Sequence, residues 1–132
     1  MIESEFVSLR SFIAVLPAKA CDMTIIFRYG TFELSPQVMQ ERSFECGSVG
    51  CIKGWMQIKL TLEGREDFSP DSVLGLGGEE SGILFFEFPV ADIRWKDWML
   101  ARLDQIIKTG QISDWRHIPE LNPEYFRAIR SS

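Results

Sequence analysis

Residues 95–110 read WKDWMLARLDQIIKTG, and this stretch predicts a clear helix. Its apolar residues recur every three or four positions, which is the period of one helix face. Lys108 and Gly110 are typical of a helix C-terminus, because a basic side chain complements the helix dipole and glycine readily accepts the left-handed conformation after the last turn. The face expected to be buried consists of Trp95, Met99, Leu103, Ile106 and Ile107.

Helical patterns recur outward from this stretch. Residues 3–16 (ESEFVSLRSFIAVL) carry apolar side chains at helical spacing and are followed by Pro17, which ends a helix. Residues 48–62 predict a central, well-buried helix, because their apolar side chains cover about half of its circumference. Three shorter helices are expected where a capping residue precedes a proline. These starts are Ser35-Pro36, Ser69-Pro70 and Asn122-Pro123.

The remaining apolar segments complete the fold prediction. Residues 21–34 are rich in β-branched and aromatic residues and predict either a short strand or hairpin, or a buried irregular segment. Residues 82–89 (GILFFEFP) are densely apolar and are expected to lie in the core. With 132 residues, the chain is long enough for one ordinary core. We therefore predict a mainly α fold: a compact single domain over residues 1–132, with at most a small β element near residues 22–34.

The sequence favours a cytoplasmic protein that has no contact with a membrane. No apolar run approaches the roughly 20 residues that span a bilayer. Two glutamates precede the apolar patch of the N-terminal segment, whereas a secretory signal begins with basic residues. The chain has three cysteines, and this odd number argues against an oxidised disulfide framework.

Negative charge is concentrated in residues 63–80, called here the acidic stretch. The net charge is −5, and this stretch holds the whole excess, with six acidic residues against Arg65. The acidic residues are Glu63, Glu66, Asp67, Asp71, Glu79 and Glu80. A nucleic-acid-binding protein carries a basic surface and none is visible, so direct nucleic-acid binding is not expected. The spacing does not fit a calcium loop, and no two carboxylates stand out as a glycosidase pair. A solvated loop and an acidic docking surface for a basic partner both fit.

The stretch ECGSVGCIKGW (residues 45–55) admits several kinds of chemistry. Cys21, Cys46, Cys51 and His117 would make a formal zinc set, but the C-x4-C spacing is looser than that of a zinc knuckle. We therefore predict no metal and no cofactor. A Cys46–Cys51 disulfide would not persist in a reducing cytoplasm. Glycine-assisted entry into a helix, with the cysteines as small buried hydrophobic residues, is the favoured reading.

A cysteine nucleophile is the second reading of the same stretch. If Ser48 caps the helix, Cys51 lies in its first turn, where the helix dipole lowers a thiol pKa. His117 is the one imidazole that could act as the base. The alternative function is therefore a small cysteine-dependent enzyme that uses Cys46 or Cys51 with His117.

Trp98 does not belong to the predicted core face of its helix. It lies opposite Leu103 and Ile107, near Arg102. Tryptophan and arginine dominate the energetics of protein interfaces, so Trp98 and Arg102 are candidate partner-binding residues together with the acidic stretch. The competing reading is that Trp98 packs under the acidic stretch or under the C-terminal segment.

The chain also resembles a family of uncharacterised small bacterial and phage proteins. Their motif, C-G-[ST]-x-x-C-x-x-G-[WH], is followed by Leu-Gly-Leu and Leu-Phe segments, and the match covers roughly residues 44–110. The matching residues here are Cys46, Gly47, Ser48, Cys51, Gly54 and Trp55. Ser48 replaces the usual threonine, and Lys53 stands where a small residue is usual. The resemblance implies a small helical domain often found on mobile elements, and it implies no activity.

These observations lead to one favoured functional hypothesis. We expect a non-enzymatic protein-binding module that uses the acidic stretch and the Trp98/Arg102 face. With the phage-like resemblance, a concrete version is an inhibitor of a host defence complex. Its acidic surface would occupy a groove that normally receives nucleic acid, because the same electrostatics attract both. The expected partner is thus a protein, in this version a nucleic-acid-binding complex.

Overall fold

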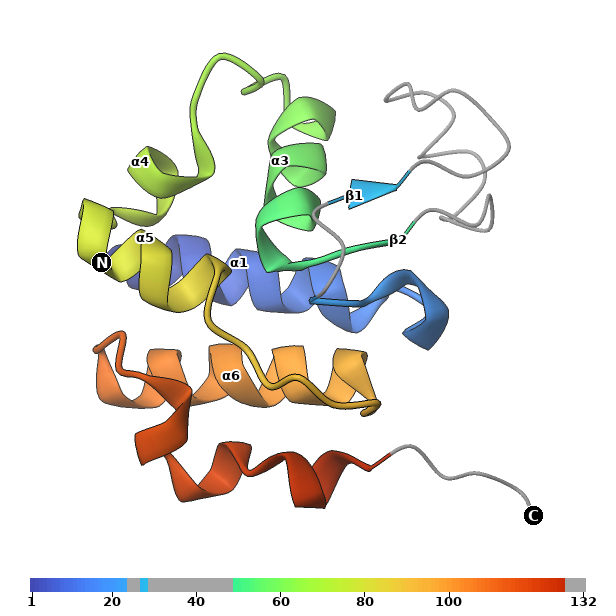
Figure 1. Cartoon of the computed structure of the whole chain (residues 1–132). Helices are drawn as coiled ribbons and strands as arrows, with labels where there is room; N and C mark the ends of the chain where they lie inside the picture. Colours follow the sequence, from blue (N-terminus) through green and yellow to red (C-terminus); the bar gives the residue numbers. More distant parts are fainter. Residues whose placement is uncertain (24–26, 29–48, 128–132) are drawn as a thin grey trace.

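The computed structural model describes residues 1–23, 27–28 and 49–127, and this part of the chain is mainly helical (Figure 1). The prediction of a mainly α fold with little β structure is confirmed. The α-helices are α1 (Glu3–Ala14), α3 (Ile52–Leu62), α4 (Pro70–Leu74), α5 (Gly78–Phe85) and α6 (Trp95–Thr109). Short 3-10 helices are η1 (Ala18–Ala20), η2 (Trp115–His117), η3 (Pro119–Leu121) and η4 (Pro123–Phe126).

Helices α1 and α6 form the centre of the molecule and run side by side (Figure 1). The buried face of α1 consists of Phe6, Leu9 and Ile13. On α6, the predicted face is confirmed, although Ile107 is only half-buried. Helices α3 and α4 pack on α1, and the segment that contains η3 and η4 packs on α6. Two layers of packing therefore meet on α6, one from α1 and one from the C-terminal segment.

Several predicted helix ends are confirmed by their capping contacts. The Ser69 hydroxyl accepts a hydrogen bond of 3.2 Å from the backbone N–H of Ser72 at the start of α4. Gly110 follows α6 with a φ of 70°, the left-handed conformation that glycine favours. Asn122 accepts a bond of 3.0 Å from the N–H of Glu124, although the turn that it caps is a 3-10 helix. The helix expected after Ser35-Pro36 lies outside the described residues.

The start of α3 corrects the sequence prediction. The helix begins at Ile52 rather than near residue 48, because Val49–Gly50 forms strand β2. This strand pairs antiparallel with β1 (Phe27–Arg28), and Gly50 also bridges to Cys21. A small β element near residues 22–34 is thus confirmed. Its partner strand comes from a segment predicted to be helical.

The apolar run at residues 82–89 is only partly core, which is a second correction. Helix α5 ends at Phe85, and its last two residues, Leu84 and Phe85, are buried. Phe86 is 58% exposed, because the chain leaves the helix there and turns its side chain outward. Within the described residues, no helix combines the length and the apolar character that crossing a membrane requires.

Candidate interaction surfaces

Three of the six acidic residues in the acidic stretch have partners within the chain. The Glu63 carboxylate pairs with Lys59 at 2.8 Å and with Arg65 at 3.2 Å. The Asp71 carboxylate accepts a hydrogen bond of 2.8 Å from the Ser81 hydroxyl, which links α4 to α5. The Glu80 carboxylate accepts a bond of 3.0 Å from the backbone N–H of Gly77 at the start of α5. These three carboxylates therefore hold the local structure together.

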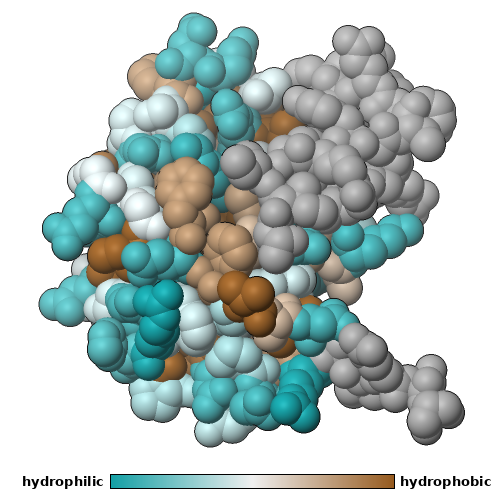
Figure 2. Space-filling model, in the orientation of Figure 1, coloured by the Kyte–Doolittle hydropathy of each residue, from teal (hydrophilic) through white to brown (hydrophobic). Residues whose placement is uncertain are grey.

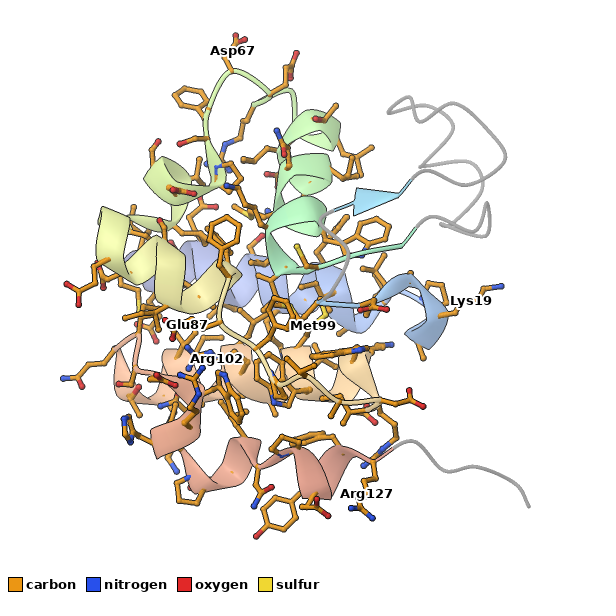
Figure 3. All side chains as sticks on the ribbon, viewed as in Figure 1. Lys19, Asp67, Glu87, Met99, Arg102 and Arg127 are labelled. Atoms are coloured by element: carbon orange, nitrogen blue, oxygen red, sulfur yellow. The ribbon has the colours of Figure 1, made fainter. Side chains whose placement is uncertain are left out.

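The other three carboxylates, on Glu66, Asp67 and Glu79, face solvent. In the part of the chain that the structure describes, none of them takes part in an ion pair or a hydrogen bond. Figure 3 shows Asp67 at the outer tip of the loop that joins α3 to α4, directed away from the body of the molecule. These side chains are available to a partner at no cost to internal contacts.

Arg65 anchors the loop that carries Glu66 and Asp67. Its guanidinium donates to the Glu5 carboxylate of α1 at 3.1 Å and to Glu63 at 3.2 Å. The bond to Glu5 is the main reason why the pKa of Arg65 lies above its ordinary value. Its backbone N–H also donates to the carbonyl of Leu60 at 2.7 Å. The acidic loop is thus tied to α1 and α3 at its base.

Exposed apolar side chains form a patch that the sequence did not indicate. Figure 2 shows them gathered over the end of α5 and the segment that follows it. The members of this Phe86 patch are Phe86, the half-buried Phe88 and Val90, which is 98% exposed. The ammonium of Lys53 lies 5.2 Å from the centre of the Phe86 ring. The run of apolar residues looked like core, and only the chain direction after Phe85 shows otherwise.

Trp98 is buried, so the prediction that it forms an exposed interface anchor is wrong. Its side chain is 0% exposed, and its indole N–H donates a hydrogen bond of 3.1 Å to the carbonyl of Leu121. Its ring makes edge contacts with Trp95 and Trp115, with ring centres 5.8 and 6.4 Å away. The competing reading, that Trp98 packs under the C-terminal segment, is confirmed.

Arg102 is also fully buried and cannot act as a surface residue in this structure. One terminal nitrogen, Nη2, donates to the carbonyl of Ser113 at 2.6 Å, whereas Nε and Nη1 have no hydrogen-bond partner. Burial lowers the pKa of Arg102 to about 10, and the nearby carboxylates of Asp114 and Glu87 act in the opposite direction. Figure 3 shows Arg102 and Glu87 close together beside the C-terminal segment.

The described cysteines have the character of buried core residues. Cys21 and Cys51 are 4% and 3% exposed and form no disulfide. Burial raises the pKa of Cys21 to about 12. It also raises the pKa of Cys51, although backbone N–H groups at the start of α3 favour the thiolate. The lowered thiol pKa that a first-turn position predicted for Cys51 is therefore wrong, because desolvation outweighs the helix terminus.

The structure does not bring Cys51 and His117 together. His117 is exposed in η2, and Figure 1 shows η2 and the start of α3 on opposite sides of α6. Among the described residues, no three potential metal ligands form a group. Cys46 lies outside these residues, so the alternative in which Cys46 is the nucleophile stays a prediction.

The predicted partner-binding residues thus fall into three sets, of which the first, Glu63, Asp71 and Glu80, is engaged in internal contacts. Glu66, Asp67 and Glu79 are exposed and unpaired within the described chain, whereas Trp98 and Arg102 lie beneath the C-terminal segment. No protein-family model, curated protein or solved structure matches the chain. The candidate binding surface is therefore described from the structure of this chain and not from a related protein.

Proposed function

We propose that the chain is a non-enzymatic protein-binding module. Its binding surface, called here the acidic face, consists of Glu66, Asp67 and Glu79 together with the exposed phenylalanines Phe68 and Phe86. The observation that carries the proposal is that, within the described residues, these three carboxylates face solvent without internal partners, while Arg65 holds the loop with Glu66 and Asp67 against α1 and Glu79 lies in the first turn of α5. Phe68 and Phe86 are 59% and 58% exposed. Large exposed aromatic side chains beside charged groups are typical of protein interfaces.

The chemistry of the acidic face suits a basic protein with apolar recesses. Carboxylates that have no competing cation attract Lys or Arg side chains over a Debye length of about 8–10 Å and thereby raise the association rate. The phenylalanines supply affinity, since burying one such side chain contributes roughly 1.5–3 kcal/mol. The carboxylates would orient the partner during association, and burial of the phenylalanine rings would stabilise the complex.

The concrete version of this function is an inhibitor encoded by a phage or another mobile element. Its target would be a host defence complex that binds nucleic acid, and the acidic face would occupy the basic groove of that complex. The net charge of −5 and the resemblance to small phage and bacterial proteins support this version. The inhibitor would then compete with nucleic acid for the same groove.

The test begins with affinity capture of the tagged protein from its native host at low and moderate salt. The captured partner is then titrated against the double variant Glu66→Lys/Asp67→Lys. The matched control is Glu3→Lys/Glu120→Lys, which alters the net charge equally at two exposed glutamates elsewhere. Asp71 is left unchanged, because its bond to Ser81 supports the fold.

We expect the test variant to bind at least about tenfold more weakly and to lose most of its salt dependence, whereas the control should lose little. Equal losses in both variants would mean that only the net charge matters. Unchanged binding by the test variant would exclude the acidic face.

A further inference from the structure

The segment that covers α6, residues 111–127, is called here the C-terminal strap. Four buried side-chain atoms in the described residues have no hydrogen-bond partner, and all four lie on α6 or on the strap. They are Nε and Nη1 of Arg102, Oε1 of Gln105 and Nε1 of Trp115. A buried polar group without a partner costs about 1–3 kcal/mol. This penalty is concentrated where the strap meets α6.

The strap is fastened mainly through its backbone. Side chains near or on α6 donate to three of its carbonyl groups: Trp98 to Leu121 at 3.1 Å, Arg102 to Ser113 at 2.6 Å and Arg94 to Tyr125 at 2.8 Å. The secondary structure of the described strap consists of short 3-10 helices and one isolated β-bridge, between Arg127 and Ile93. Its buried apolar side chains are Leu121 and Ile118, which are 0% and 8% exposed, and Ile112, Trp115 and Phe126 pack on the core while only partly buried.

The two sides of α6 therefore differ in the kind of contact that covers them. Towards α1, the buried part of the contact is apolar, since Phe6, Leu9 and Ile13 of α1 are 0% exposed, and the ion pair of Arg10 with Asp104 is exposed. Towards the strap, a charged guanidinium is buried with one hydrogen bond. When the strap lifts, Arg102, Gln105 and Trp115 regain hydrogen bonds to water, which offsets part of the lost burial. Segments with few buried contacts open before the rest of a protein.

We propose that the C-terminal strap lifts from α6 as a unit while α1, α3 and α6 remain folded, and that this opening exposes Trp98 and Arg102. The closed state hides a tryptophan and an arginine, the residue types that contribute most at protein interfaces. The open state presents both on a folded helix. This device goes beyond the proposed function, since it does not involve the acidic face.

Two buried tryptophans provide an internal comparison for the test. Trp98 and Trp55 are both 0% exposed, and each indole N–H donates to a backbone carbonyl. The acceptor for Trp98 is Leu121 in the strap, whereas the acceptor for Trp55 is Ala20 in η1, at 2.7 Å. Hydrogen exchange of both indole protons is measured by NMR on the full chain under native conditions, together with the backbone amides of Leu121 and Leu103.

We expect the Trp98 indole to exchange at least about tenfold faster than the Trp55 indole and the Leu103 amide, at a rate close to that of the Leu121 amide. Equal rates for the two indoles would overturn the proposal, because Trp98 would then be exposed only by global unfolding. Rapid exchange of the Leu121 amide with a slow Trp98 indole would overturn it as well, since the strap would fluctuate without uncovering α6.

A pair of leucine variants gives a second, independent readout. Leu121→Ala removes an apolar anchor of the strap, and Leu84→Ala removes an equally buried leucine from α5. Leu121→Ala should accelerate the Trp98 indole at least about tenfold and leave the Trp55 indole unchanged, because only the strap loses stability. Leu84→Ala should accelerate both indoles. Equal acceleration of both indoles by Leu121→Ala would show that the strap and the core unfold together.

Discussion

The backbone N–H of Ile2 donates a hydrogen bond of 2.9 Å to the carbonyl of Leu74, which sets the Ile2 side chain directly against Gly75. Gly75 ends α4 with a φ of 70°. A Cβ atom on Gly75 would lie 2.9 Å from Cγ1 of Ile2, closer than van der Waals contact allows. Gly110 has the same φ, but nothing lies within 4 Å of the position of its Cβ. An added Cβ would thus meet backbone strain at both glycines, but a steric clash with Ile2 only at Gly75.

Alanine substitutions at these glycines should differ in their cost. Gly110→Ala should lower the free energy of unfolding by about 1 kcal/mol, because alanine pays for the left-handed conformation. Gly75→Ala should lower it by about 2–4 kcal/mol, because Ile2 must also move. Urea denaturation of both variants measures the difference. Equal losses would mean that Ile2 yields without cost.

The buried thiol of Cys21 predicts a loss of stability at alkaline pH. Its pKa is about 12 in the folded protein, whereas that of an unfolded cysteine is about 8.5. Since the folded pKa is the higher one, the contribution of this thiol is complete below pH 8.5 and declines as the pH rises towards 12. Between pH 8.5 and 10, the free energy of unfolding should fall by about 1–2 kcal/mol from this group.

The matching measurement compares the wild type with Cys21→Ala in urea denaturation at several pH values. The variant should lose less stability between pH 8.5 and 10, because it lacks the titrating thiol, while the other groups titrate in both proteins. Identical slopes for the two proteins would contradict the prediction, since they would mean that Cys21 ionises as easily in the folded chain as in the unfolded one.

Replacement of Arg102 by methionine should be tolerated despite its complete burial. Methionine keeps the packing of the side-chain stem and removes a charge that has one hydrogen bond. The neighbouring carboxylates of Asp114 and Glu87 would still be paired with the guanidinium of Arg116, whose Nη1 lies 2.8 and 3.9 Å from their oxygens. We expect the free energy of unfolding to stay the same or to rise by up to about 2 kcal/mol.

The control for this prediction is Arg102→Ala, which should destabilise the protein by about 2 kcal/mol or more because it removes the buried stem as well. Both variants are compared with the wild type by urea denaturation at pH 7. A loss of more than about 2 kcal/mol for Arg102→Met would show that the charge itself stabilises the strap.

The sequence predicted the helices best where their ends depend on neighbouring residues. Ser69 caps α4 and Gly110 follows α6 as expected, since both effects act within one turn. The start of α3 was wrong because Val49–Gly50 pairs with Phe27–Arg28, a contact between distant segments. Local periodicity contains no information on such pairing.

The candidate site was predictable only in part for the same reason. The acidic stretch was visible from composition, but the engagement of Asp71 by Ser81 depends on how α4 meets α5. Trp98 and Arg102 appeared to lie on an outer helix face, because the apolar stripe of α6 was taken as its one buried face and the opposite face was expected to meet solvent. The strap buries a second face of α6. Its own sequence has no strong helical period, so it did not indicate that this segment packs on α6.

The pairing of α1 with α6 also bears on how the chain is made. Arg10 and Asp104, which form an ion pair of 2.9 Å between these helices, are 94 positions apart in the sequence. At a synthesis rate of about 5–20 residues per second, the apolar face of α1 waits on the order of 5–20 s for its partner helix. During this time Phe6, Leu9 and Ile13 have no α6 to cover them. A nascent chain halted before α6 should therefore bind chaperones that recognise exposed apolar segments, whereas a chain released after it should not.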